Sequence, residues 1–113
     1  MIFLFLLANA TMLEAEPAPS VPSKAYTSCV RKNGTAMEPA GESIEFTVKA
    51  AFMACRNERA DLVRSINYWQ SKMSQFSEVY KKQRLQMQVD MTEQPLEAQL
   101  TSSLMLRRAE ARK

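Results

Sequence analysis

The sequence contains no histidine among its 113 residues. Histidine is the side chain that most often serves as a general base at neutral pH, and it is the commonest metal ligand. It is also the usual partner of a nucleophilic serine or cysteine. We therefore expect a chain that is not an enzyme and that binds no cofactor.

Glycine and cysteine are scarce as well, with two of each, whereas there are eight methionines. This composition favours helices over sheets, and the length suits one domain. The formal net charge of +3 is a small basic excess. Because DNA and RNA are bound by a concentrated basic face, so small an excess gives no reason to expect a nucleic-acid partner.

A short apolar run, IFLFLL at residues 2–7, is followed by ANA at residues 8–10. An apolar core that ends in small residues is typical of a secretory signal peptide, although here no Lys or Arg precedes it. The run is too short to span a membrane, which takes about 20 apolar residues. The sequence predicts cleavage before Thr11 and a periplasmic or secreted protein.

Three prolines fall within the six residues 17–22. Proline has a fixed φ angle and no N–H, so such a cluster favours an extended chain over a helix. The predicted organisation is a signal peptide over residues 1–10, a proline-rich disordered linker over residues 11–23 and a helical domain over residues 24–113.

Hydrophobic spacing predicts a short first helix and a long second one. The first begins after Ser23 and ends at the stop signal Asn33–Gly34. In the second, apolar residues recur from Val48 in alternating steps of four and three, which is the heptad pattern of a coiled coil. Arg59 interrupts this pattern at a position where an apolar residue is expected.

Neither glycine nor proline occurs between residues 42 and 94. With Ser43 as its N-cap, one helix could extend from Ile44 to Asp90, a length of about 70 Å. A compact domain of this size has a radius of gyration of only about 13 Å. Such a helix must therefore protrude, break, or pack against another chain.

A third helix is predicted from Thr92, which can serve as its N-cap, because a proline at residue 95 is tolerated in a first turn. Leu96, Leu100 and Leu104 recur every four residues and form a narrow apolar stripe. We expect the first helix to fold back on the start of the long helix and the third helix to fold back on its end.

The two cysteines, Cys29 and Cys55, lie 26 residues apart. In an exported chain an even number of cysteines indicates disulfides. Two cysteines cannot supply the four Cys or His ligands of a structural zinc site, and there is no C-x-x-C redox motif. The sequence predicts a Cys29–Cys55 disulfide, with intermolecular pairing or a free thiol as the alternatives, and no metal ligand. The predicted fold class is an all-α, disulfide-stapled helical hairpin with one long central helix and a C-terminal third helix.

The residues around both cysteines, YTSC at 26–29 and AAFMACR at 50–56, resemble a pattern of small exported helical proteins of Alphaproteobacteria. That pattern has a tyrosine shortly before the first cysteine, an alanine-rich approach to the second and a charged continuation. The resemblance covers residues 24–66. It implies a disulfide-linked helical hairpin and an envelope location, and it implies no activity.

The apolar stripe of the long helix is the strongest functional indication, because the outer helices are expected to leave its middle uncovered. Contiguous exposed apolar surface marks interaction sites, where tryptophan and tyrosine are favoured. An equal alternative is a closed three-helix bundle that buries Trp69. We predict that the chain binds a protein partner, or a second copy of itself, through five residues: Ile66, Trp69, Met73, Phe76 and Tyr80.

Three weaker indications remain. A retained N-terminal apolar segment and the basic stretches at 81–84 and 107–113 would suit a protein that lies on a membrane surface. Met87 and Met91 lie one turn apart and could bind Cu(I), although methionine more often fills helical cores. The acidic residues at 38, 42 and 45 could pair as carboxylates, but no residues that would form a pocket accompany them.

Overall fold

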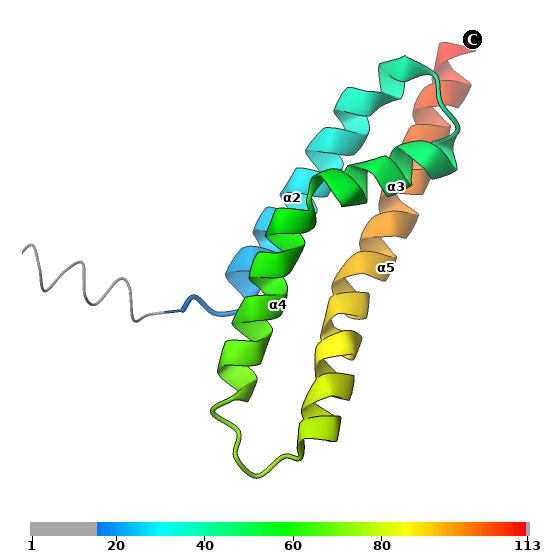
Figure 1. Cartoon of the computed structure of the whole chain (residues 1–113). Helices are drawn as coiled ribbons and strands as arrows, with labels where there is room; N and C mark the ends of the chain where they lie inside the picture. Colours follow the sequence, from blue (N-terminus) through cyan, green and yellow to red (C-terminus); the bar gives the residue numbers. More distant parts are fainter. Residues whose placement is uncertain (1–15, 113) are drawn as a thin grey trace, which may run out of the picture.

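The structure is a computed structural model that describes residues 16–112 (Figure 1). This part of the chain is helical and contains no strand, which confirms the all-α class. The predicted signal peptide and the first part of the predicted linker, residues 11–15, lie outside the described residues. Among residues 16–112 there are four α-helices instead of the predicted three, with one short 3-10 helix: α2 (Ser20–Met37), η1 (Glu38–Ala40), α3 (Ile44–Ala54), α4 (Arg56–Gln70) and α5 (Glu78–Ala111).

Helix α2 begins earlier than predicted, at Ser20, so the last four residues of the expected linker form its first turn. Pro22 is tolerated there because the first N–H groups of a helix have no intrahelical partner. The helix also continues past Gly34, which was wrongly expected to end it. Gly34 is buried, and a Cβ atom on it would lie 2.8 Å from both Cδ atoms of Leu100. Glycine at this position therefore allows α2 and α5 to approach closely.

The predicted long helix breaks at Cys55. Ser43 caps α3 as expected, since its hydroxyl accepts a hydrogen bond from the Phe46 N–H at 3.1 Å. At Cys55 the backbone leaves the helical region (φ −106°, ψ 25°), and α4 starts at the next residue in a different direction. As a result α3 lies across α5, while α4 runs beside α2 (Figure 1).

A loop of residues 71–77 makes the second break, and α5 then begins at Glu78 with Ser77 as its N-cap. The helix passes through Pro95 to Ala111, so the predicted start at Thr92 is wrong. Proline leaves the carbonyl four residues before it, that of Met91, without its usual donor. Because the Met91 side chain is exposed, water can reach this part of the helix. The helix therefore accommodates Pro95 on its solvent side.

The core lies where α2, α3 and α4 meet α5, and the described residues form a flat body of 61 × 43 × 16 Å. A thickness of 16 Å is less than two helix diameters, so every helix keeps an exposed side. The predicted stripe of α5 is confirmed as part of the core. The buried apolar residues are Tyr26, Val30, Val48, Ala51, Cys55, Leu62, Ile66, Val89, Leu96, Leu100 and Leu104.

A disulfide and an ion pair connect α2, and the residue that follows it, to other parts of the bundle. The predicted disulfide is confirmed: Cys29 of α2 is bonded to Cys55 at the α3–α4 break, with their Cα atoms 6.0 Å apart. At the C-terminal end of α2, Arg108 of α5 donates to the Glu38 carboxylate at 2.5 Å and also to the Glu42 carbonyl. This hydrogen bond from Arg108 holds the pKa of Glu38 below its ordinary value. Glu38 therefore serves as an ion-pair partner in the fold.

Candidate functional site

The residues predicted to bind a partner separate into two groups. Ile66 is only 2% exposed and belongs to the core, so it cannot form part of an open surface. It is covered because α2 starts four residues before the predicted position, and Pro19 and Ser20 reach it there. The other four, Trp69, Met73, Phe76 and Tyr80, lie together at the end where α4 turns into α5.

We call this region the aromatic end and define it as Tyr68, Trp69, Met73, Phe76 and Tyr80. Figure 1 shows that the α4–loop–α5 turn extends beyond the start of α2, so no other described helix covers it. The alternative of a bundle that buries Trp69 is wrong, because Trp69 is 40% exposed and Tyr80 is 44% exposed. Met73 and Phe76 are half-buried.

The aromatic rings are held in place although they face solvent. The Trp69 indole N–H donates to the Pro17 carbonyl at 3.0 Å, and the Ser65 hydroxyl donates to the same oxygen at 2.8 Å. The Tyr68 and Trp69 rings pack edge to face with centroids 5.5 Å apart, and the Phe76 and Tyr80 centroids are 4.7 Å apart. These contacts fix ring orientations before any partner binds.

Lysine side chains come from the same segments as the aromatic end. The Lys72 ammonium lies 4.9 Å from the centroid of the Tyr68 ring, a cation–π distance. The first turns of α5 add Lys81 and Lys82. Lys81 is largely buried and pairs with Glu78 at 3.5 Å, while Lys82 is exposed. An apolar centre with a basic rim is complementary to an apolar surface that carries acidic groups.

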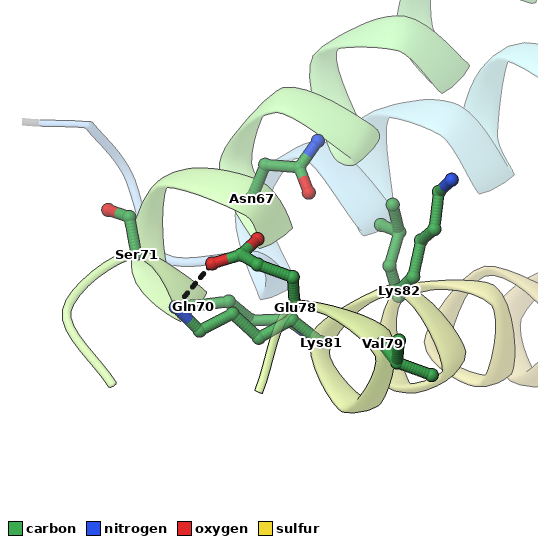
Figure 2. Close-up of a pocket in the computed structure, with 8 residues that line it drawn as sticks. Asn67, Gln70, Ser71, Glu78, Val79, Lys81 and Lys82 are labelled. Carbon is green, nitrogen blue, oxygen red and sulfur yellow. Dashed lines mark ion pairs between the residues drawn. The ribbon is translucent and has the colours of Figure 1, made fainter. Parts of the chain in front are cut away.

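A groove of about 700 Å³ separates the end of α4 from the start of α5 (Figure 2). Gln70 lines it and is only 4% exposed, yet neither atom of its amide group has a hydrogen-bond partner. Ser71, also in the groove, donates its hydroxyl to the Tyr68 carbonyl at 2.5 Å. The lining residues of the groove are Asn67, Gln70, Ser71, Glu78, Val79, Lys81, Lys82 and Leu85.

A second polar cluster lies inside the helix bundle and accounts for Arg59, the residue that interrupts the heptad pattern. Glu93 of α5 accepts hydrogen bonds from the Arg59 guanidinium at 2.9 Å and from the Tyr26 hydroxyl at 2.5 Å. Burial raises the pKa of Tyr26 above its ordinary value, and the hydrogen bond to Glu93 adds to the effect. The same carboxylate raises the pKa of Arg59. The cluster joins α2, α4 and α5, and its role is structural.

The raised pKa of Tyr26 predicts a loss of stability at high pH. Tyrosine in the unfolded chain loses its proton near pH 10, whereas folded Tyr26 keeps it. We expect Tyr26→Phe to reduce the free energy of unfolding by about 1.5 kcal/mol below pH 10. This difference should shrink above pH 10, by up to about 1.4 kcal/mol per pH unit. Urea unfolding of both proteins at pH 8 and pH 11 measures it, and an equal difference at the two pH values would contradict the role given to Tyr26.

Three polar side chains at helix positions that face the protein interior were not predicted from the sequence: Gln70, Glu58 and Glu93. Glu93 carried a detectable signal, because it falls on the inner stripe between Val89 and Leu96.

No helix among residues 16–112 is both long and apolar enough to cross a bilayer. The resemblance of residues 24–66 to exported helical proteins stays a prediction from the sequence. No protein-family model, no curated protein and no solved structure matches this chain.

Proposed function

We propose that this chain is an exported, non-enzymatic helical protein that binds a protein partner through its aromatic end. The observation that carries the proposal is the state of Trp69, which is 40% exposed and at the same time held by a hydrogen bond to Pro17. Large aromatic side chains that are ordered before binding lose little entropy in a complex. Tryptophan and tyrosine are also the residues that most often dominate binding energy at interfaces.

The architecture supports a docking role for this end of the molecule. The Cys29–Cys55 bridge and the Arg108–Glu38 ion pair lie away from the aromatic end. With the Arg59–Glu93 pair they connect the four helices, and the α4–α5 turn extends beyond these contacts. The proposed partner presents an apolar patch for the rings and acidic groups for Lys72 and Lys82.

Export is proposed from two features that point the same way. One is the signal-like pattern of residues 1–10, and the other is the Cys29–Cys55 bridge. Disulfides persist in oxidising compartments such as the periplasm and the extracellular space. The proposed location is therefore the cell envelope or the medium.

The test compares single serine substitutions in the aromatic end with matched substitutions elsewhere. Trp69→Ser, Phe76→Ser and Tyr80→Ser remove exposed or half-buried rings, while Phe46→Ser and Met53→Ser remove exposed apolar side chains from α3. Tagged proteins are used to capture partners from envelope extract, and affinity for the captured partner is then measured by titration. We expect each aromatic-end variant to weaken binding by about 30-fold, which is the size of an interface hot spot, and the α3 variants to bind as the original chain does.

Two results would contradict the proposal. The first is equal affinity for all variants, because the aromatic end would then not contact the partner. The second is binding to vesicles of anionic lipid that Lys72→Gln and Lys82→Gln abolish, with no protein captured. This second result would identify the basic rim as a membrane-surface site instead.

A further inference from the structure

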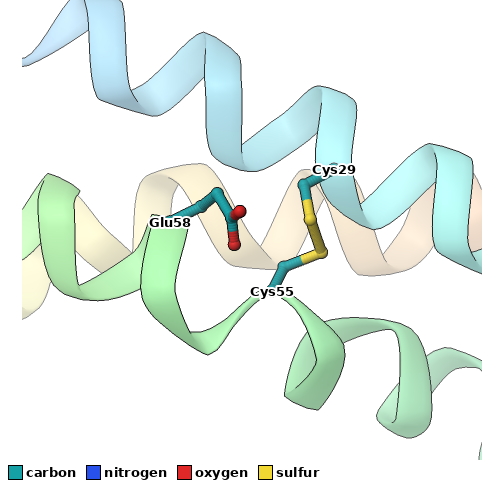
Figure 3. Close-up of side chains that lie close together, drawn as sticks. All are labelled: Cys29, Cys55 and Glu58. Carbon is teal, nitrogen blue, oxygen red and sulfur yellow. A yellow bond between two sulfur atoms is a disulfide. The ribbon is translucent and has the colours of Figure 1, made fainter.

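Three groups that can bind a metal meet where α2 contacts the α3–α4 break. The Sγ atoms of Cys29 and Cys55 and a carboxylate oxygen of Glu58 all lie within 4.8 Å of one another. Glu58 belongs to the first turn of α4, and Figure 3 shows its carboxylate turned toward the sulfur atoms. The two sulfurs are joined as a disulfide, while the carboxylate stands beside them without a bond to either.

The orientation of Glu58 is not explained by helix capping. A glutamate in the first turn often accepts a hydrogen bond from the N–H of the N-cap residue. Here the N-cap is Cys55, and its N–H already donates to the Phe52 carbonyl at 3.1 Å. The Oε2 atom of Glu58 is buried and has no hydrogen-bond partner. A buried carboxylate oxygen without a partner is unfavourable, and a cation would remove the penalty.

Asn33 completes the surroundings of the two sulfur atoms. Its side-chain N–H group donates to the Cys29 carbonyl at 2.9 Å and lies 3.5 Å from each Sγ atom. Amide donors next to cysteine sulfurs stabilise the thiolate form and orient it toward a metal. After reduction, the Asn33 side-chain N–H group would therefore lie beside two thiolates, where it now lies beside the disulfide.

We propose that reduction of the Cys29–Cys55 disulfide turns this cluster into a zinc site with Cys29, Cys55 and Glu58 as ligands. A dithiol reductant transfers two electrons and two protons to the bridge and is itself oxidised to a disulfide. Zn²⁺ then replaces the two thiol protons, which pass to solvent, and binds two thiolates and one carboxylate. A water molecule takes the fourth tetrahedral position, as in zinc sites that have three protein ligands.

The backbone around the cluster can accept this change. Two Zn–S bonds of about 2.3 Å hold sulfurs farther apart than a disulfide does. Cys55 lies at a break, so no helix passes unbroken through it. Cys29 is half-buried and gives an entry route for the ion. Glu58, which lies beside both sulfurs, supplies the third protein ligand that the cysteines and the absent histidines do not.

The experiment uses the full chain, reduced with a phosphine that does not compete for zinc, and a Glu58→Gln variant. Glu97→Gln, an exposed carboxylate on α5, is the matched control. Zinc affinity is measured against a chromogenic chelator, and Co²⁺ serves as a probe whose thiolate charge-transfer absorption reports sulfur ligation. We expect one Zn²⁺ per reduced chain and none per oxidised chain. Loss of an outer-shell partner typically weakens metal affinity about tenfold. We expect Glu58→Gln to weaken zinc affinity by more than this, and Glu97→Gln to leave zinc affinity unchanged.

The proposal is overturned if the reduced chain binds no Zn²⁺, or if Glu58→Gln binds it as tightly as the original chain. If the reduced metal-free chain loses helical circular dichroism, zinc must restore it in the original chain and restore it less well in Glu58→Gln. A failure of zinc to restore the signal equally overturns the proposal. The proposed binding of a partner by the aromatic end is independent of every one of these outcomes.

Discussion

Replacement of both bridge cysteines by alanine is expected to lower the free energy of unfolding by about 3.5 kcal/mol, the chain-entropy value for a loop of this length. The bridge spans a sequence separation of 26 and joins α2 to the point where α3 becomes α4. Without it the unfolded chain gains conformational freedom, while the folded chain loses the tie that fixes the break. Because a small domain has a total stability of only about 5–15 kcal/mol, the loss of the bridge removes a large part of it. Urea unfolding at neutral pH measures it.

The control for the disulfide prediction is the original chain treated with a phosphine reductant in the presence of a metal chelator. It should lose nearly the same stability as the Cys29→Ala, Cys55→Ala double variant, because both lack the cross-link and both lack metal. A loss below about 1 kcal/mol in both samples would mean that the bridge is not what constrains these helices.

Gly34→Val is expected to destabilise the fold by about 1–3 kcal/mol through overpacking, and Leu100→Ala by about 2–5 kcal/mol through loss of buried volume. The reason is the contact between α2 and α5, where even a Cβ atom on Gly34 would lie 2.8 Å from the Leu100 side chain. In the double variant the valine enters the space that leucine vacates. The double variant should therefore be more stable than the sum of the two single changes predicts, by about 0.5–3 kcal/mol.

Ala36→Val is the matched control for this double-mutant cycle. Ala36 is an exposed residue of the same helix, so its replacement reports only the lower helix propensity of valine, about 0.7 kcal/mol or less. If Gly34→Val costs no more than Ala36→Val, or if the two single effects simply add, the close approach of α2 and α5 at this point is wrong.

Local signals in the sequence were sufficient to predict the helices but not where they end. The cap at Ser43, the disulfide and the leucine stripe of α5 depend on neighbouring residues or on simple spacing, and the structure confirms each of them. Asn33–Gly34 and Pro95 were read as a helix end and a helix start, and both lie inside helices. At Gly34 a distant contact decides, because Gly34 meets Leu100, which is 66 residues away, whereas Pro95 is accommodated on the exposed side of α5.

No helix-breaking residue marks the break at Cys55. The segment AAFMACRNERADL contains neither glycine nor proline, and its heptad spacing continues through the cysteine. Only the tertiary arrangement shows why one long helix does not form: α3 and α4 both pack on α2 and α5, and they do so in different directions. Arg59 was an indirect clue, because its guanidinium meets Glu93 of a helix 34 residues away.

The exposure of the predicted partner-binding residues could be compared with the structure, while their binding role stays a prediction. Spacing placed Trp69, Met73, Phe76 and Tyr80 on the middle of one long helical stripe, whereas the structure places them around the α4–α5 turn, with Trp69 and Tyr80 exposed. The prediction failed for Ile66, because the expected linker covers it as the first turn of α2. The loop of residues 71–77 breaks the straight stripe, so Trp69 lies at the end of α4 and Tyr80 at the start of α5.

The most direct test of the docking claim is site-specific photo-crosslinking in cells that export the protein. A benzophenone amino acid is placed at Phe76 or Tyr80 in the aromatic end, and at Phe46 or Met53 on α3 as exposed controls. Our account predicts one crosslinked protein species from positions 76 and 80 and none from positions 46 and 53. Crosslinks from the α3 positions alone, or no protein crosslink from any of the four, would contradict it.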